Sequence, residues 1–203
     1  NNNNNELIMT MQERTTTKLT WDGSVAESFS WGSGTESEPY LIADGKDLAY
    51  LARQVNNGNT YEGQYFQIAD DIDLGARSWT PIGTSQNSFR GILDGAGHTI
   101  SNATITVSNL PDKTYESYGI FASIGGGNTK TIIRNLELSN INVEITASGD
   151  TGTVNDGIFS GGVEQDAEGL HIGTLVGSMY KNSNLLNVIV KSSVIQDTNV
   201  INI

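Results

Sequence analysis

The chain has 203 residues, of which 36% are hydrophobic and 17% charged, a composition of a folded domain rather than of a disordered segment. Its net charge is -12 and no run of basic residues occurs, which argues against a nucleic acid partner. Cysteine is absent, so disulfides, thiolate nucleophiles and cysteine-based metal sites are excluded. No apolar run is long enough to span a membrane.

Residues 1–18 are polar and rich in threonine, and they begin with a run of asparagine in place of an initiator Met. We interpret them as a flexible N-terminal segment of a processed protein whose signal sequence has been removed. The asparagine run is typical of a spacer after an anchoring site, as in a lipoprotein, and equally of a ragged terminus.

Residues 19–80 are expected to form an N-terminal cap with one helix at residues 44–58. The apolar positions follow helical spacing at Leu48, Leu51, Ala52 and Val55. Asp44 is suited to the N-cap, Asp47 to the positive first turn, and Gly58 to the C-terminal stop. A single apolar face predicts that this helix lies against the rest of the protein as a structural cap.

Acidic residues gather in residues 70–74, where Asp71 and Asp73 share one side of a predicted strand. They are weak candidates for a Ca²⁺ site, because Ca²⁺ takes six to eight oxygen ligands in a shaped loop. The segment lacks the loop of an EF-hand, so a solvated strand face is the default interpretation. No cofactor is expected, with bound Ca²⁺ as the minor alternative.

Residues 81–203 are expected to form stacked parallel strands with a long insertion at residues 146–171. Three segments repeat a glycine two residues before a large apolar residue, at Gly91–Leu93, Gly119–Phe121 and Gly173–Leu175. Each segment then carries an asparagine followed by an apolar strand, at Asn102, Asn135 and Asn187. The spacing after each asparagine is constant while the preceding segment varies, as in stacked repeats with variable loops.

The three repeated asparagines predict a structural ladder at one corner of the stack. Asparagine tolerates left-handed backbone torsions better than most residues, and its amide both donates and accepts. Stacked on one another, Asn102, Asn135 and Asn187 are expected to bond along one inward column. Catalysis or glycosylation at any one of them is the weaker interpretation, because the residue recurs in register.

A family resemblance follows from these residues. Residues 20–74, followed by WTPIG and FRGILDGAGHTISN, resemble the opening module of bacterial cell-surface proteins that carry GLUG-type repeats. Residues 172–187 resemble one such repeat, with matches at Gly173, Leu175, Val176 and Gly177. Residues 119–138 match more loosely. The resemblance implies a right-handed parallel β-helix and an adhesin-like role at the cell surface, and it carries over no catalytic residues.

Asp94 and His98 are the candidate acid and base for catalysis, with Arg90 nearby in the sequence. Acid–base chemistry needs two groups held across a substrate, and a pair four residues apart in a glycine-rich turn is not held rigidly. Enzymes of the parallel β-helix type that degrade acidic polysaccharides gather carboxylates and basic residues on one face. No second segment rich in Arg or Lys follows, so catalysis is the minor hypothesis.

Binding is the favoured function. The insertion is long, glycine-rich and acidic, with Asp150, Asp156 and Asp166, and long loops on rigid scaffolds often carry binding. Tyr115, Tyr118 and Tyr180 are candidate exposed aromatic residues on one flank.

We therefore expect a secreted protein, or one attached to the cell surface or outer membrane. It is expected to bind a glycan or protein ligand and to be non-enzymatic. The alternatives are a β-helix polysaccharide lyase or hydrolase and a structural stalk. The alternating apolar end of the chain either closes the stack or leaves an edge for self-association.

Overall fold

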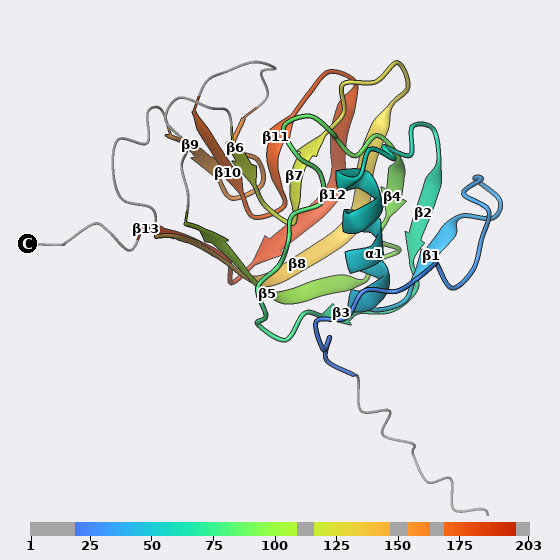
Figure 1. Cartoon of the computed structure of the whole chain (residues 1–203), viewed down its shortest axis with the longest axis horizontal. Helices are drawn as coiled ribbons and strands as arrows, with labels where there is room; N and C mark the ends of the chain where they lie inside the picture. The colour runs from blue at the N-terminus through green and yellow to red at the C-terminus, as the bar shows by residue number, and fades with distance from the viewer. Residues whose placement is uncertain (1–18, 109–115, 147–153, 163–168, 198–203) are drawn as a thin grey trace, which may run out of the picture.

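The computed structural model describes residues 19–108, 116–146, 154–162 and 169–197. Within these ranges the fold is mainly β, and one helix, α1 (Gly45–Asn56), accompanies the strands (Figure 1). Every pairing between these strands is parallel. The expectation of a mainly β protein with parallel sheets and an N-terminal helix is confirmed.

The strands divide into one large and two small sheets. In chain order they are β1 (Tyr40–Ile42), β2 (Tyr65–Ile68), β3 (Ile72–Asp73), β4 (Ile92–Asp94), β5 (Thr99–Val107), β6 (Glu116–Tyr118), β7 (Phe121–Ile124), β8 (Thr131–Ile145), β9 (Val154–Gly157), β10 (Leu170–Gly173), β11 (Val176–Met179), β12 (Ser183–Lys191) and β13 (Val194–Asp197). The large sheet has the order β1-β2-β4-β8-β5-β3, and β12 and β13 also pair with β8. The small sheets are β6-β10-β9 and β11-β7.

Strand β8 is the centre of the large sheet. Its beginning pairs with β4 and its second half with β5, while β12 and β13 pair along its other edge. Leu93, Ile133 and Leu185 therefore lie side by side in three successive strands. In Figure 1 the long strands β5, β8 and β12 run beside one another. Their side chains alternate in burial, because successive residues of a strand point to opposite faces.

An aromatic column runs through the core. The ring centroids of Phe66 and Phe89 are 5.7 Å apart, and those of Phe89 and Phe121 are 5.3 Å apart. Phe29, from the segment before β1, extends the column with its ring 5.4 Å from that of Phe66. Such pairs each contribute about 0.5–1.5 kcal/mol beyond the burial of apolar area. The column therefore links the segment before β1 to strands that follow it far along the chain.

Helix α1 begins and ends as its sequence predicts. The carboxylate of the N-cap, Asp44, accepts a hydrogen bond from the Asp47 N–H at 3.1 Å. Gly58 follows the helix with φ 107°, a conformation that glycine adopts without strain. The face that packs on the core is formed by Leu48, Leu51, Ala52 and Val55. No helix in the described ranges has both the length and the apolar character needed to cross a bilayer.

A ladder of side-chain hydrogen bonds links neighbouring strands of the large sheet. The Asn135 amide donates to Asp94 Oδ1 at 3.3 Å, and the Asn187 amide donates to Asn135 Oδ1 at 2.9 Å. The φ angles of Asn135 and Asn187 are 53° and 52°, in the left-handed region that asparagine tolerates. An aspartate thus begins the ladder and two asparagines continue it.

Asn102 belongs to a second ladder, which corrects the expectation of one inward column. Asn187 in the first ladder and Asn140 in the second are also exposed. The Asn102 amide donates to Asp73 Oδ1 at 2.9 Å, and Asn102 Oδ1 accepts from the Asn140 amide at 2.8 Å. Of the three asparagines in strand β8, Asn135 and Asn140 share one local pattern, with apolar residues two before and one and three after each. Only the pairing of β5 with β8 decides that Asn102 lies beside Asn140.

The expected N-terminal cap and the expected insertion both contribute strands to the sheets. Strands β1, β2 and β3 lie within residues 19–80, the expected cap, yet they pair with other strands of the large sheet. Strand β9 lies within residues 146–171, the expected insertion, yet it pairs in parallel with β10. Parts of both regions therefore belong to the sheets.

Strand β12 forms an outer edge of the large sheet in the described part of the chain. Leu186 and Ile189 are 50% and 48% exposed there. Leu185, Val188 and Val190 are only partly buried against the core. Because an edge strand presents unpaired N–H and C=O groups, this apolar edge is a template for pairing with another strand.

Candidate functional site

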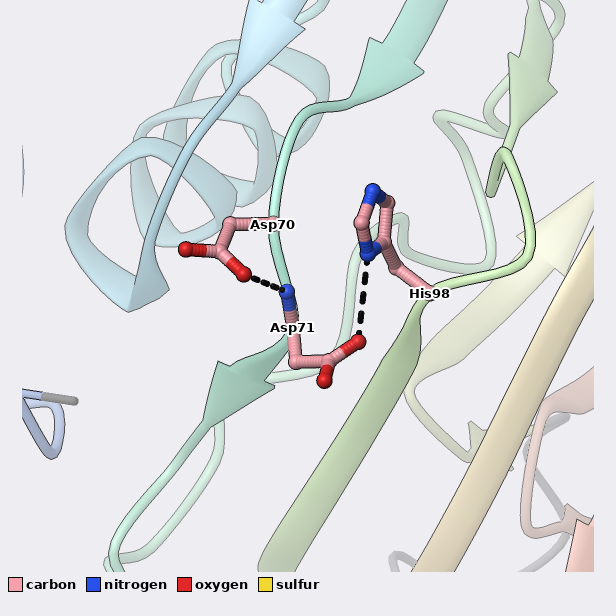
Figure 2. Close-up of side chains that lie close together, drawn as sticks. All are labelled: Asp70, Asp71 and His98. Atoms are coloured by element: carbon pink, nitrogen blue, oxygen red, sulfur yellow. Dashed lines mark hydrogen bonds and ion pairs between the residues drawn. The ribbon is translucent and has the colours of Figure 1, made fainter. Parts of the chain in front are cut away.

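Three potential metal ligands meet at the surface, where the loop between β2 and β3 approaches the residue that precedes β5 (Figure 2). His98 Nδ1 lies 3.2 Å from Asp71 Oδ1, which also accepts from the Thr99 N–H at 3.0 Å. Asp70 accepts from the N–H of Asp71 at 2.7 Å. Ligand atoms of Asp70, Asp71 and His98 all lie within 4.8 Å of one another. One imidazole with two carboxylates suits a transition metal better than it suits Ca²⁺.

Asp73 does not join this cluster. Its Oδ1 accepts from the Gly75 N–H at 2.8 Å and from the Asn102 amide at 2.9 Å. The carboxylate of Asp73 therefore serves a turn and an amide ladder, while Asp71 pairs with His98. The two weak Ca²⁺ candidates are thus used separately, and the structure groups Asp71 with Asp70 instead.

Asp94 and His98, the candidate catalytic pair, also engage different partners. Asp94 accepts from the Ala96 N–H at 2.8 Å and from Arg134 Nε at 3.0 Å. Burial favours a higher pKa for Asp94, but hydrogen bonds from Ala96 and the ladder amide, with the Arg134 guanidinium, outweigh it and lower the pKa. A carboxyl group held ionised in this way is a poor proton donor. His98 pairs with Asp71, so no acid–base pair is assembled from these two residues.

The glycine-rich segment 125–128 is held by Glu62. Glu62 Oε1 accepts from the N–H groups of Asn128 at 2.6 Å and Thr129 at 3.1 Å. These bonds, with the Arg90 charge nearby, lower the pKa of Glu62. Arg90 Nε in turn donates to the Gly125 carbonyl at 3.4 Å. Arg90 and this loop therefore brace each other, and they do not form a site with Asp94 and His98.

A groove of about 740 Å³, which we call the Trp21 groove, opens between residues 21–25, α1 and residues 77–80. The rings of Trp21 and Trp79 meet edge to face in its wall, with centroids 5.5 Å apart and planes at 68°. Trp79 is buried, and its indole N–H donates to the Ile120 carbonyl at 3.0 Å. Trp21 is only half-buried, so its indole presents apolar surface to the groove.

Two arginines also line the Trp21 groove. Arg77 Nε donates to the Trp21 carbonyl at 3.0 Å, and Arg53 donates to the Ala26 carbonyl at 3.1 Å. Glu27 lies 3.8 Å from Arg53, and both side chains are solvent-exposed. Sequence reasoning missed this site. Its signal is weak: arginines near tryptophans in a chain with 11 basic residues.

Two of the predicted binding residues, Tyr118 and Asp156, stand in register on either side of Ile172 in the β6-β10-β9 sheet. Tyr180 is 9% exposed, and Tyr118 is half-buried, with a pKa raised by burial and by the Glu116 charge. Neither is an openly exposed aromatic residue of the kind expected at a binding flank. Asp156 is exposed on β9. Three further candidates lie outside the described residues: Tyr115, Asp150 and Asp166.

No family model matches the chain, and no solved structure matches it. Over 187 residues it is 32% identical to Halomucin of Haloquadratum walsbyi, a match that covers 85% of the chain and 2% of that protein. Over 119 residues it is 35% identical to a Gly-rich membrane protein of Evansella cellulosilytica, covering 55% of the chain and 12% of that protein. The chain is therefore similar to a small part of two much longer proteins, one of which is named for a membrane location.

Proposed function

We propose that the chain is a module of a secreted or cell-surface protein that binds a glycan or protein ligand, in the manner of an adhesin, without catalysing a reaction. The observation that carries this proposal is the similarity to part of Halomucin over 85% of the chain. The second relative is named a membrane protein. The names of both relatives favour a location at or outside the cell membrane.

The scaffold that we propose for this role is a right-handed parallel β-helix with GLUG-type repeats. Parallel pairing along both edges of β8 and the two amide ladders support stacked turns of one coil. A Cβ atom at Gly173 would collide with the Val176 carbonyl, and one at Gly177 would lie 2.6 Å from the Tyr118 nitrogen. Both repeat glycines are thus required by close backbone approach. Right-handedness follows from the general preference of parallel crossovers.

A glycan array run beside a reducing-sugar assay on acidic polysaccharides tests this function. We expect the folded chain to be captured on a subset of glycans and to release no reducing ends. A heat-unfolded sample serves as the control for nonspecific capture. Release of new reducing ends would establish the lyase or hydrolase alternative in place of binding.

A structural stalk is the second candidate function, because the ladders and the parallel stack favour a stiff module within a long protein. If the chain binds neither the glycans on the array nor surface proteins, the stalk is favoured over the adhesin. We also place self-association at the apolar edge of β12, where Leu186 and Ile189 are exposed.

A further inference from the structure

The Trp21 groove combines features that suit a sugar ring bearing an anionic group. Its wall includes the half-buried Trp21 indole, and aromatic faces pack well on the apolar C–H faces of sugar rings. Exposed neutral polar side chains line the same groove at Asn57, Ser78 and Thr80. Ligand sites of this kind join apolar surface to a few placed polar groups that fix orientation.

Arg77 supplies the charged group best placed for a carboxylate. Its Nε donates to the Trp21 carbonyl, which holds the guanidinium against the Trp21 backbone at the groove. No hydrogen bond or ion pair within the described part of the chain engages its terminal nitrogens. The Asp22 carboxylate accepts from the Ser24 N–H at 2.9 Å, and its pKa is lowered by the hydrogen bonds from Ser24 and, to a smaller extent, by the Arg77 charge. The planar guanidinium therefore presents donors in the fork geometry that matches a carboxylate.

Arg53 adds a second positive charge to the groove. Its side chain is held by the Ala26 carbonyl and lies 5.5 Å from the centroid of the Tyr50 ring. Glu27, 92% exposed, lies 3.8 Å away and offsets this charge only weakly because water screens it. Two arginines in one groove stand out in a chain of net charge -12.

We propose that the Trp21 groove binds a carboxylated sugar unit of an acidic glycan, with its carboxylate on Arg77 and its ring against Trp21. This inference rests on the proposed binding function and names its ligand class and its site. A sugar fits better than an acidic peptide, because neutral hydroxyl and amide side chains at Asn57, Ser78 and Thr80 surround the two charges. A polyhydroxylated ring offers each of them a partner.

Binding of a galacturonate tetramer to the full chain, measured by calorimetry beside the uncharged galactose tetramer, tests this site. We expect binding of the galacturonate tetramer alone, weakening as salt rises. Arg53→Gln/Arg77→Gln should weaken it by about tenfold or more, because both charges and the fork are lost. The matched control Lys130→Gln/Lys181→Gln removes the same charge from exposed positions outside the groove and should stay within about twofold.

Arg53→Lys/Arg77→Lys covers the case in which loss of the Arg77 bond to Trp21 unfolds the glutamine variant. It keeps both charges but lacks the planar fork, so we expect a loss of about three- to tenfold with an unchanged melting temperature. Binding should also change the tryptophan fluorescence of the wild type. Equal losses of affinity in Arg53→Gln/Arg77→Gln and in the control Lys130→Gln/Lys181→Gln would overturn the site, because only overall charge would then matter.

The outcomes separate this inference from the proposed function. Capture of another glycan on the array, unaffected by the arginine variants, would overturn the groove and leave the adhesin role standing. Tighter binding of a glutamate tetrapeptide than of the galacturonate tetramer would overturn the sugar assignment. Failure to bind any glycan or surface protein would overturn both.

Discussion

Single residues with left-handed backbone torsions change the direction of this chain. Asn135 combines φ 53° with two ladder bonds, one to Asp94 and one from Asn187. Ala96 has φ 50° without an amide side chain to compensate. A left-handed conformation costs an ordinary L-residue about 1–2 kcal/mol. The ladder asparagines therefore serve both the backbone and the stacking.

Substituting Asn135 separates these two contributions. Asn135→Ala loses both bonds and strains the backbone, so we expect the free energy of unfolding to fall by about 2–4 kcal/mol. Asn135→Gly loses the bonds but tolerates the torsion, and should cost about 1 kcal/mol less than Ala. Urea unfolding measures both. Asn184→Ala, at an exposed position on β12, is the control and should cost under about 0.5 kcal/mol. Equal effects of Ala and Gly would contradict the torsional role.

The ionised carboxylate of Asp94 contributes to the free energy of unfolding in a way that depends on pH. Its folded-state pKa is lowered below the ordinary value, with bonds from Ala96 and Arg134 outweighing burial. The stability that it contributes is therefore present above the unfolded pKa of about 3.9 and is lost as pH falls through the lower folded value. Asp94→Asn should be less stable than the wild type at pH 7, with the gap closing below about pH 4. Urea midpoints across this range that show a constant gap would contradict the assignment.

At the scale of elements, the two ends of the large sheet differ. At the β1 end, α1 packs its apolar face on the core, and Trp21 lies against Gly45. At the β12 end, apolar side chains remain half-buried or exposed in the described ranges. One end is therefore covered by a helix, while the other presents an edge that another strand can extend.

A charge on the β12 edge should reduce self-association. We expect the wild type to associate as its concentration rises, because Leu186 and Ile189 flank unpaired backbone groups. Ile189→Lys places a charge at this edge and should shift sedimentation toward the monomer. Leu19→Lys adds the same charge outside any strand and should leave association unchanged. A wild type that remains monomeric throughout would contradict the edge contact.

At the scale of the whole molecule, the dominant electrostatic feature is the net charge of -12. Self-repulsion of like charges destabilises a compact state, and salt screens it. The melting temperature should therefore rise between about 10 mM and about 150 mM NaCl. A flat response would mean that local ion pairs dominate.

The same experiment examines the surface cluster of Asp70, Asp71 and His98. CaCl₂ at matched ionic strength should change the melting temperatures of the wild type and of Asp71→Asn equally. Two carboxylates and an imidazole do not provide the six to eight oxygen ligands that Ca²⁺ takes. A rise in the melting temperature of the wild type in CaCl₂ that Asp71→Asn abolishes would establish a calcium site there. Thermal melts in the two salts, run side by side, decide between these results.

Much of the fold was predictable because it follows from local patterns. The spacing of Leu48, Leu51 and Val55 predicted α1, and Asp44 and Gly58 predicted its ends. The alternation of apolar residues predicted strands, and their repetition predicted parallel sheets. The candidate site was not predictable in the same way. Neither the pairing of His98 with Asp71 nor the Trp21 groove leaves a pattern at fixed spacing.

The amino-acid sequence by itself determined the class of structure, since periodicity, capping residues and turn-forming residues act through neighbours along the chain. The tertiary structure alone decided which residues meet. Asn102 pairs with Asn140 because the register of β5 on β8 is set jointly by many buried side chains. Likewise, Trp21, Arg53 and Arg77 share one groove only because the segment around Trp21 packs on α1 and on the residues after β3. Contacts between distant segments depend on the whole core, and no short stretch of sequence contains that information.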